Sequence, residues 1–423
     1  MKRLTLLLPL AVALGATGCN REVTCAADET VCGGTCASLQ GDPFHCGACG
    51  NACATGQGCS AGACVDCTAP GAACTAAVVA ACGNLNQVRL LASNLALAAA
   101  PIDTDELPIS IARLGQTLYV ANSLSSSLSA VTLSPPPATS GATAIPVPSP
   151  VGSADLENVA VLGSRLWVSD AAASTLVAID PATGGVVDEI ALAATAGDAV
   201  NPQGLAFVGT KGYLALGTTF TGGTSVNQLL VLDLSTVPGG RIVKRIDLQP
   251  LASPGAQASP SRVVAVGSKV YVTLNNARDT AFVRVAGANG RLAVVDATTD
   301  TLAAEAVDLG AGCVNPSGLV LEGTTLWVAR GFVQLAPDFL SVASIDGASL
   351  TPVDAATGTP GAPVPLPNAA TSVAFCGGRG YAGASDSGTV IAFDPTTRAI
   401  STADACPVAA GKLSQVPDLA CPP

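Results

Sequence analysis

Six aromatic residues at near-regular intervals constrain the fold of this sequence more than any other feature. The Tyr and Trp residues of the chain are Tyr119, Trp167, Tyr213, Tyr271, Trp327 and Tyr381. They recur at similar intervals along the chain, and each aromatic follows a short segment that begins with glycine. Self-similarity at a nearly fixed period indicates a fold built from one repeated unit. We expect each aromatic to fill the same core position of its unit.

The residues around each aromatic predict four short β-strands per unit. An apolar strand precedes the glycine turn, and the aromatic strand follows it. The third strand ends in an aspartate turn, as in Ile179-Asp180-Pro-Ala-Thr-Gly184. Such a turn predicts a hairpin in which the Asp side chain accepts backbone amide hydrogens and the Gly adopts a positive φ. Because 45 Gly and 29 Pro divide the apolar content into short runs, the sequence predicts an all-β protein, a six-bladed β-propeller. Seven blades are the alternative if residues 84–107 supply a degenerate unit.

Residues 108–408 resemble the YVTN-type β-propeller repeat, which is close to the NHL group. Tyr119-Val-Ala-Asn122 and Tyr271-Val-Thr-Leu274 stand where that family carries its naming tetrapeptide. The resemblance implies the propeller fold. It implies no particular function, because propellers include both binding proteins and enzymes.

The N-terminal residues predict export. Lys2 and Arg3 precede an apolar run, residues 4–14, which is too short to span a bilayer but typical of a signal peptide. Ala16-Thr17-Gly18-Cys19 resembles a bacterial lipobox, which implies a signal peptide over 1–18, a lipidated Cys19 and a tether over 19–31. We therefore expect an outer-membrane or cell-surface lipoprotein that contacts the membrane through its lipid anchor only. Secretion after cleavage behind Gly18 is the alternative.

Eleven of the 16 cysteines lie between Cys25 and Cys82, a density that predicts a disulfide framework in an exported chain. Residues 32–66 form the predicted module, and 32–64 resemble a cysteine-rich repeat of myxobacterial surface proteins and the plant stigma-specific domain. The cysteines expected in disulfides are Cys32, Cys36, Cys46, Cys49, Cys53, Cys59 and Cys64 in the module, and Cys376 and Cys406 in the last blade. A zinc site at Cys46, Cys49, Cys64 and Cys67 beside His45 is the weaker alternative, since other cysteines interleave these pairs.

Three further boundaries follow from the pattern. A linker is expected over 67–107, the propeller over 108–408 and a tail over 409–423. Within the linker, residues 87–98 are either a connector or an outer strand of the closing blade.

Charge and composition exclude some functions. The net charge of −11 argues against nucleic acid, which needs a basic surface. His45 is the only histidine, which argues against histidine acid–base chemistry and histidine metal sites. The sequence predicts no cofactor and no metal.

Insertions in three consecutive repeats point to a binding face. The turn Asp follows the aromatic closely in the second and sixth repeats, where Trp167 precedes Asp180 and Tyr381 precedes Asp394. The same interval is much longer in the next three repeats, which run from Tyr213 to Asp233, from Tyr271 to Asp296 and from Trp327 to Asp354. The extra residues fall between the second and third strands, and these connections share one face of a propeller.

The inserted segments have the composition of an interface. Aromatic and Arg residues on projecting loops are typical of binding surfaces. The candidate binding residues are Phe220, Arg278, Phe282, Arg284, Arg330, Phe332, Gln334 and Phe339, with Arg262 expected at the channel mouth beside them. The phenylalanines have a second interpretation, a small satellite core that holds the loops together.

The leading functional hypothesis is an exported, lipid-anchored cell-envelope binding protein whose partner is an unknown protein or glycan. One alternative is a metal-dependent lactonase- or esterase-like hydrolase with Glu157, Asn158, Asn201 and Asn315 as ligands. The other is a structural envelope component.

Overall fold

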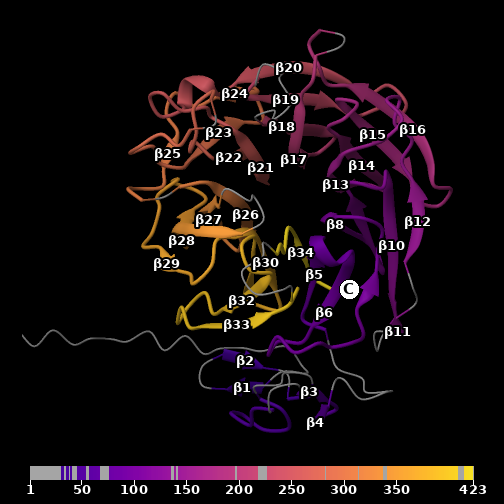
Figure 1. Cartoon of the computed structure of the whole chain (residues 1–423), viewed down its shortest axis with the longest axis vertical. Helices are drawn as coiled ribbons and strands as arrows, with labels where there is room; N and C mark the ends of the chain where they lie inside the picture. Colours follow the sequence, from indigo (N-terminus) through magenta and orange to yellow (C-terminus); the bar gives the residue numbers. More distant parts are fainter. Residues whose placement is uncertain are drawn as a thin grey trace, which may run out of the picture.

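The computed structural model describes a ring of β-sheets and a small disulfide-rich module. The residues that it describes are 30–32, 35–37, 39–40, 45–53, 57–66, 76–134, 138–139, 142–195, 198–217, 226–281, 283–312, 314–336, 341–407 and 414–422. Seven antiparallel sheets surround a common centre (Figure 1), which makes this an all-β, seven-bladed propeller.

Six blades follow one another along the chain, each from inner to outer strand. Blade one is β8 (Pro108–Leu114), β9 (Thr117–Asn122), β10 (Ser127–Ser134) and β12 (Thr143–Pro146), with β11 (Ala138–Thr139) also paired to β10. Blade two is β13 (Leu156–Leu162), β14 (Arg165–Asp170), β15 (Thr175–Asp180) and β16 (Gly185–Ala191). Blade three is β17 (Asn201–Val208), β18 (Lys211–Gly217), β19 (Gln228–Asp233) and β20 (Arg241–Asp247). Blade four is β21 (Pro260–Val266), β22 (Lys269–Leu274), β23 (Arg291–Asp296), β24 (Thr301–Leu302) and β25 (Val307–Asp308). Blade five is β26 (Pro316–Glu322), β27 (Thr325–Leu335), β28 (Val342–Asp354) and β29 (Val364–Pro365). Blade six is β30 (Ala370–Cys376), β31 (Arg379–Ala384), β32 (Thr389–Phe393) and β33 (Ile400–Asp404).

The seventh blade closes the ring with strands from both ends of the propeller. Its inner strand is β34 (Leu419–Ala420), and its other strands are β5 (Val78–Cys82), β6 (Gln87–Leu91) and β7 (Ile102–Asp103). Seven blades, the alternative count, is therefore the observed one. The expected linker 67–107 and tail 409–423 need correction, because strands from both belong to this blade. Of residues 87–98, only 87–91 form a strand, β6, which is the third strand of this blade and not its outer strand.

Packing between blades confirms that the ring is complete. Seven apolar clusters are each shared by two adjacent blades, and the clusters at the closing blade join it to blade six and to blade one. Each sheet thus buries both faces, which explains why its strands are apolar runs without strict alternation. The six repeated aromatics lie in the second strands of blades one to six and are 0–8% exposed, so their predicted core role is confirmed.

The glycine before each aromatic has a conformational reason. The φ angles of the six turn glycines lie between 57° and 62°; these glycines are Gly115, Gly163, Gly209, Gly267, Gly323 and Gly377. This left-handed conformation is strained for residues with a Cβ, and no atom lies within 4 Å of where a Cβ would stand at any of the six. The tight turn between first and second strands therefore selects glycine through its backbone, not through crowding.

The predicted aspartate turns are also present. In Asp180, Asp233, Asp296, Asp354 and Asp394, Oδ1 accepts the backbone N–H two residues later. Two of these turns also accept a hydrogen bond from the repeated tyrosine of the preceding blade. The Tyr213 hydroxyl donates to Asp300 Oδ1 at 2.6 Å in the next blade, and the Tyr271 hydroxyl donates to the Ala355 carbonyl at 2.7 Å.

Two short sheets make up the N-terminal module. They are β1 (Thr30–Cys32) with β2 (Thr35–Ala37), and β3 (Gln57–Ser60) with β4 (Ala63–Asp66). Disulfides join Cys32 to Cys49, Cys46 to Cys59 and Cys53 to Cys64. Val65 packs against the cluster shared by blades seven and one, and Asn94 Nδ2 donates to the Gln57 carbonyl, so the module touches the closing blade.

Two more disulfides secure the closure of the ring. Cys82 in β5 pairs with Cys406 beyond blade six, and Cys376 in β30 pairs with Cys421 behind β34. Cys376 and Cys406 are thus bridged as expected, each to the closing blade or its tail. The bridges of the module and the propeller together indicate an oxidising, extracytoplasmic location. The Cys36 side chain and Cys19, with the whole predicted signal peptide and tether up to residue 29, lie outside the described part.

The only helices among the described residues are two 3-10 turns, η1 (Gly83–Leu85) and η2 (Gln249–Leu251). Within the described ranges, no helix has the length and apolar character needed to cross a membrane.

Candidate functional site

A β-bulge at one equivalent position shapes the centre of the propeller. In the inner strands of blades one to six, the pairing register shifts next to the residue that stands six positions before the turn glycine. Those residues are Ile109, Glu157, Gln203, Ser261, Ser317 and Thr371. Bulges redirect side chains and are common next to functional sites. Here all six line one pocket at the mouth of the central channel.

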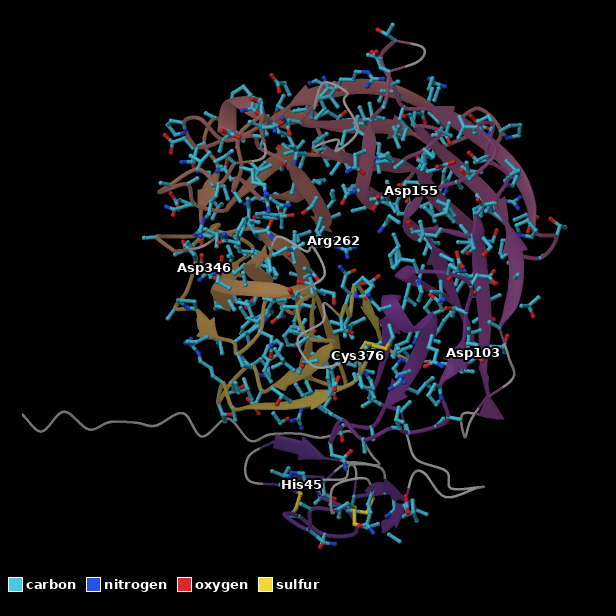
Figure 2. The ribbon with its side chains drawn as sticks, viewed as in Figure 1. His45, Asp103, Asp155, Arg262, Asp346 and Cys376 are labelled. Carbon is cyan, nitrogen blue, oxygen red and sulfur yellow. A yellow bond between two sulfur atoms is a disulfide. The ribbon has the colours of Figure 1, made fainter. Side chains whose placement is uncertain are left out.

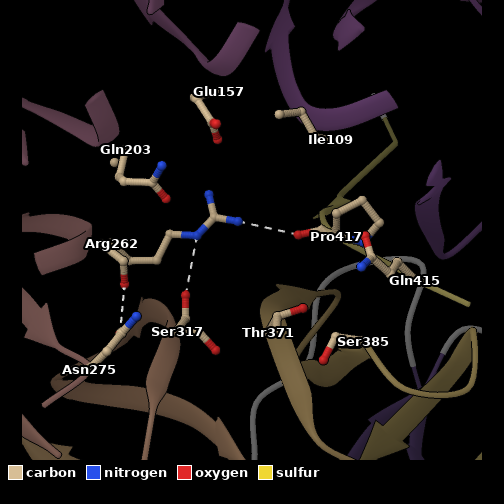
Figure 3. A pocket seen from close by; sticks show the side chains of 12 residues that line it. Ile109, Glu157, Gln203, Arg262, Asn275, Ser317, Thr371, Ser385, Gln415 and Pro417 are labelled. Atoms are coloured by element: carbon tan, nitrogen blue, oxygen red, sulfur yellow. Dashed lines mark hydrogen bonds between the residues drawn. The ribbon is translucent and has the colours of Figure 1, made fainter. Parts of the chain in front are cut away.

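The pocket has a volume of about 280 Å³ and is lined by both polar and apolar groups (Figure 3). Arg262 and Gly204, the second bulge residues of blades four and three, complete the inner ring with Gln415 and Pro417 of the tail. Asn275 and Ser385, which begin the connections between second and third strands of blades four and six, also line it. The pocket therefore opens on the face that carries these connections.

Arg262 is oriented by two backbone carbonyls. Its Nε donates to the Ser317 carbonyl and its Nη2 to the Pro417 carbonyl, both at 3.3 Å. Figure 2 shows Arg262 near the centre of the ring. The expected position of this residue at the channel mouth agrees with the structure.

Glu157 faces the same cavity from blade two. Burial raises the pKa of its carboxyl to about 7, and the charge of Asp155 adds to the rise, while Gln203 and Arg262 oppose it. Behind Arg262, burial also raises the pKa of Asp418, whose carboxylate accepts the backbone N–H of Ile111 at 2.8 Å. The channel thus holds opposite charges in a setting largely removed from bulk water.

The long connections predicted in blades three to five are present at the expected place. They join β18 to β19, β22 to β23, and β27 to β28. In blade five the insertion continues both strands as a hairpin, in which Phe332 pairs with Asp346. Phe220, Phe282 and Phe339 lie outside the described residues.

Phe332 is the centre of a small cluster on this face. It is 6% exposed and packs with Ala277 and Val314. The guanidinium groups of Arg278 and Arg284 lie 4.9 and 5.0 Å from its ring centroid. Both arginines are exposed, so they cover a buried ring. The satellite-core interpretation therefore holds for Phe332.

An ion pair joins the loop of blade four to the hairpin of blade five. Arg284 Nη1 contacts Asp346 Oδ2, and Asp346 lies toward the outer edge of the ring (Figure 2). The loop is further braced by Asn276, which is fully buried and bonds to Ser253 and to the Asn289 carbonyl. We call the exposed surface of Arg278, Arg284, Gln334 and Asp346 the loop platform. Arg330, predicted with this group, is only 3% exposed and lies beneath it.

The residues proposed as hydrolase ligands are not gathered around one point. Glu157 faces the channel, but Asn158 Nδ2 donates to Ser110 Oγ at 3.3 Å and Asn315 Nδ2 donates to the Gly331 carbonyl at 3.0 Å. Asn201 Oδ1 accepts from Gln203 Nε2 at 2.7 Å.

The zinc alternative in the module also finds no support. Cysteine sulfurs do gather beside His45, but the cysteines of both clusters are disulfide-bonded and offer no thiolate. His45 Nδ1 accepts the Gly50 backbone N–H.

The sequence pattern does not single out the pocket as a site. It points to Arg262 and Glu157 for different reasons, but not as neighbours across one cavity. The sequence signal that could locate the pocket is a fixed offset, because one pocket residue on each of the six repeated inner strands stands six places before the turn glycine of its blade.

Comparison with known proteins supports the propeller fold but identifies no family. No family model and no curated protein sequence matches the chain. A protein from Bacteroides uniformis described as a candidate 6-phosphogluconolactonase superposes with a TM-score of 0.53 at 12% identity, covering 79% of this chain and 97% of its own. Kuenenia stuttgartiensis hydrazine synthase gives 0.50 at 15% identity, over 75% and 89%. At such identities the similarity is one of architecture, and this chain is shown to be a seven-bladed β-propeller without an assigned family.

Proposed function

We propose that this chain is an exported binding protein of the cell envelope that captures a protein or glycan partner on the loop platform. The observation that carries the proposal is the position of the three long connections. They occur in adjacent blades and on one face, while the connections of blades one, two and six between the same strands are short. A rigid scaffold that concentrates variable loops on one face is a common design for recognition.

The platform is built to hold its shape. Arg278 and Arg284 stack on Phe332, and Asp346 fixes Arg284 from the neighbouring blade. Arginines that are already ordered lose less entropy when a partner binds them. Their exposed donors suit carboxylate or other acidic oxygen groups of the partner.

A tether would complete the arrangement. In this proposal Cys19 carries lipid and the disulfide module acts as a rigid spacer beneath blade seven. Replacement Cys19→Ser should release the protein from the membrane fraction without changing its folding. Retention of the variant in that fraction would contradict lipidation at this residue.

The binding proposal is tested with a matched pair of arginines. Full-length protein carrying Arg278→Ser and Arg284→Ser is compared with Arg241→Ser in a crosslinking capture from envelope extract. Arg241 is also exposed and ion-paired, with Asp233 at 2.6 Å, but lies in blade three at an aspartate turn.

We expect a partner that wild type and Arg241→Ser capture equally and that the platform variant loses. Equal capture by all three proteins would refute the platform as the binding site. Circular dichroism and melting of each variant establish that the comparison is between folded proteins.

A further inference from the structure

The channel pocket holds two ionisable side chains of opposite sign that form no direct ion pair. Arg262 and Glu157 approach the cavity from blades four and two. Four ion pairs occur within the described ranges, and none joins these two residues. Figure 3 shows the Glu157 carboxyl pointing toward the Arg262 guanidinium, with the open space of the pocket beside the two groups. A charge held away from water is costly unless it is paired.

Both groups keep hydrogen-bonding capacity for a ligand. The two carbonyls engage two of the five guanidinium N–H groups of Arg262, which leaves three for the cavity. The Gln203 side chain favours the charged form of the Glu157 carboxyl, whose pKa it lowers. The hydroxyl of Thr371, on the opposite side of the channel lining, is buried without a hydrogen-bond partner.

The size of the cavity limits what can enter. Its volume of about 280 Å³ lies just below the range of pockets that hold drug-sized ligands. A small metabolite fits this space, whereas a folded partner or a polymer strand does not. The polar side chains around the two charges are hydroxyls and amides, Ile109 and Pro417 add apolar surface, and the pocket includes no aromatic ring.

We propose that the channel pocket binds a small zwitterion of the amino-acid type, with its carboxylate on Arg262 and its ammonium group on Glu157. Fixed positive and negative groups that lie close together at the wall of a small cavity complement a ligand that carries both charges on neighbouring atoms. Neutral sugars would leave both charges unpaired, and simple anions or amines would leave one. The inference goes beyond the binding role of the loop platform, because it uses different residues.

Protonation of Glu157 gives the proposal a pH signature. The groups that face this carboxyl are Asp155, Gln203 and Arg262, and Asp418 lies behind Arg262. A protonated Glu157 cannot pair with an ammonium group, so amino-acid affinity should rise as the pH passes upward through about 7. A ligand that binds as a plain anion would show the opposite trend, since protonation leaves Arg262 as the dominant charge.

The test is calorimetric titration of the full chain with the twenty protein amino acids. The tightest binder is then compared with its decarboxylated amine and with the hydroxy acid that replaces its amino group. We expect at least a tenfold loss of affinity for each analogue. Absence of binding by all twenty at millimolar concentrations, or equal binding of either analogue, would overturn the proposal.

Variants separate recognition from folding. Glu157→Gln and Arg262→Gln should each weaken amino-acid binding at least tenfold, whereas Arg278→Gln on the platform should leave it unchanged. Glu157→Gln removes a buried charge, so its melting temperature should be equal to or above that of wild type. Wild-type affinity in a folded Glu157→Gln protein would overturn the proposal. Failure of partner capture by the platform variant leaves this measurement untouched, so the two proposals fail separately.

Discussion

The disulfide between Cys82 and Cys406 should be a major source of propeller stability. It joins residues 324 positions apart, the largest separation among the described bridges. In the chain-entropy model, a closed loop of this length restricts the unfolded state by about 6 kcal/mol, and measured bridges reach about 5 kcal/mol. We therefore expect Cys82→Ala with Cys406→Ala to lower the free energy of unfolding by about 4 to 5 kcal/mol.

The assay is a urea titration of the oxidised, full-length protein, followed by circular dichroism of the propeller. A matched control comes from the module, where Cys46 and Cys59 have a sequence separation of 13. Their replacement should cost the module about 3 kcal/mol in the same model and leave the propeller transition in place.

The result that would refute the reasoning is a loss below about 1 kcal/mol in the Cys82 and Cys406 variant, far under the range typical of native bridges. Such a result would mean that apolar packing between the closing blade and its neighbours suffices without the bridge. Titration of wild type in dithiothreitol reduces the other bridges as well, including Cys376–Cys421, so its loss should equal or exceed that of the variant.

Three further predictions follow from individual side chains. Phe332→Ala should lower stability by about 3 kcal/mol because the ring is buried, and an unchanged melting temperature would contradict its core role. Glu157 has a raised pKa, so its stability contribution is full below about pH 4.5 and is lost as pH rises through about 7. Above pH 7 the free energy of unfolding of Glu157→Gln should therefore exceed that of wild type by up to about 3 kcal/mol, and by less where water enters the cavity. A difference between the two proteins that does not change with pH would exclude this titration. Gly380→Ala places a Cβ inside the Phe393 ring and should lower stability by about 3 kcal/mol or more. In the control Gly185→Ala the nearest atom to the new Cβ is 3.4 Å away, so the loss should be under about 1 kcal/mol. Thermal melting of both variants measures the difference.

The repeat could be predicted from sequence because each of its recurring residues is required by local structure. Gly163 is needed for a left-handed turn, Asp180 accepts the amides of its own hairpin, and Trp167 fills the space between two sheets. The glycine and the aromatic recur in six blades and the aspartate in five of them, so these residues recur at similar spacing.

The seventh blade carries none of these marks. Its second strand, β5, is Val78-Val-Ala-Ala-Cys82 and has no Tyr or Trp, and its inner strand comes from the far end of the chain. Pairing between strands from opposite ends of the propeller leaves no periodic trace in sequence. The six-blade count therefore describes the repeats correctly but not the number of sheets.

The candidate site was predictable only in part. The long connections appear as extra spacing, because length is visible in a sequence. The pocket depends on a backbone bulge that turns side chains of unrelated type, from Ile109 to Glu157, toward one axis. Backbone geometry selects the position there and leaves the residue type free, so similarity between repeats does not reveal it.

Closure by β34 has a consequence for how the protein is made. A chain that emerges N-terminus first presents the edge of β5 from the start, but the strand that covers it arrives only with the last residues. During synthesis and export this edge of β5 stays unpaired, a state prone to association with other chains. Because Cys406 and Cys421 also arrive late, oxidation of both closing bridges requires that all seven blades have been delivered.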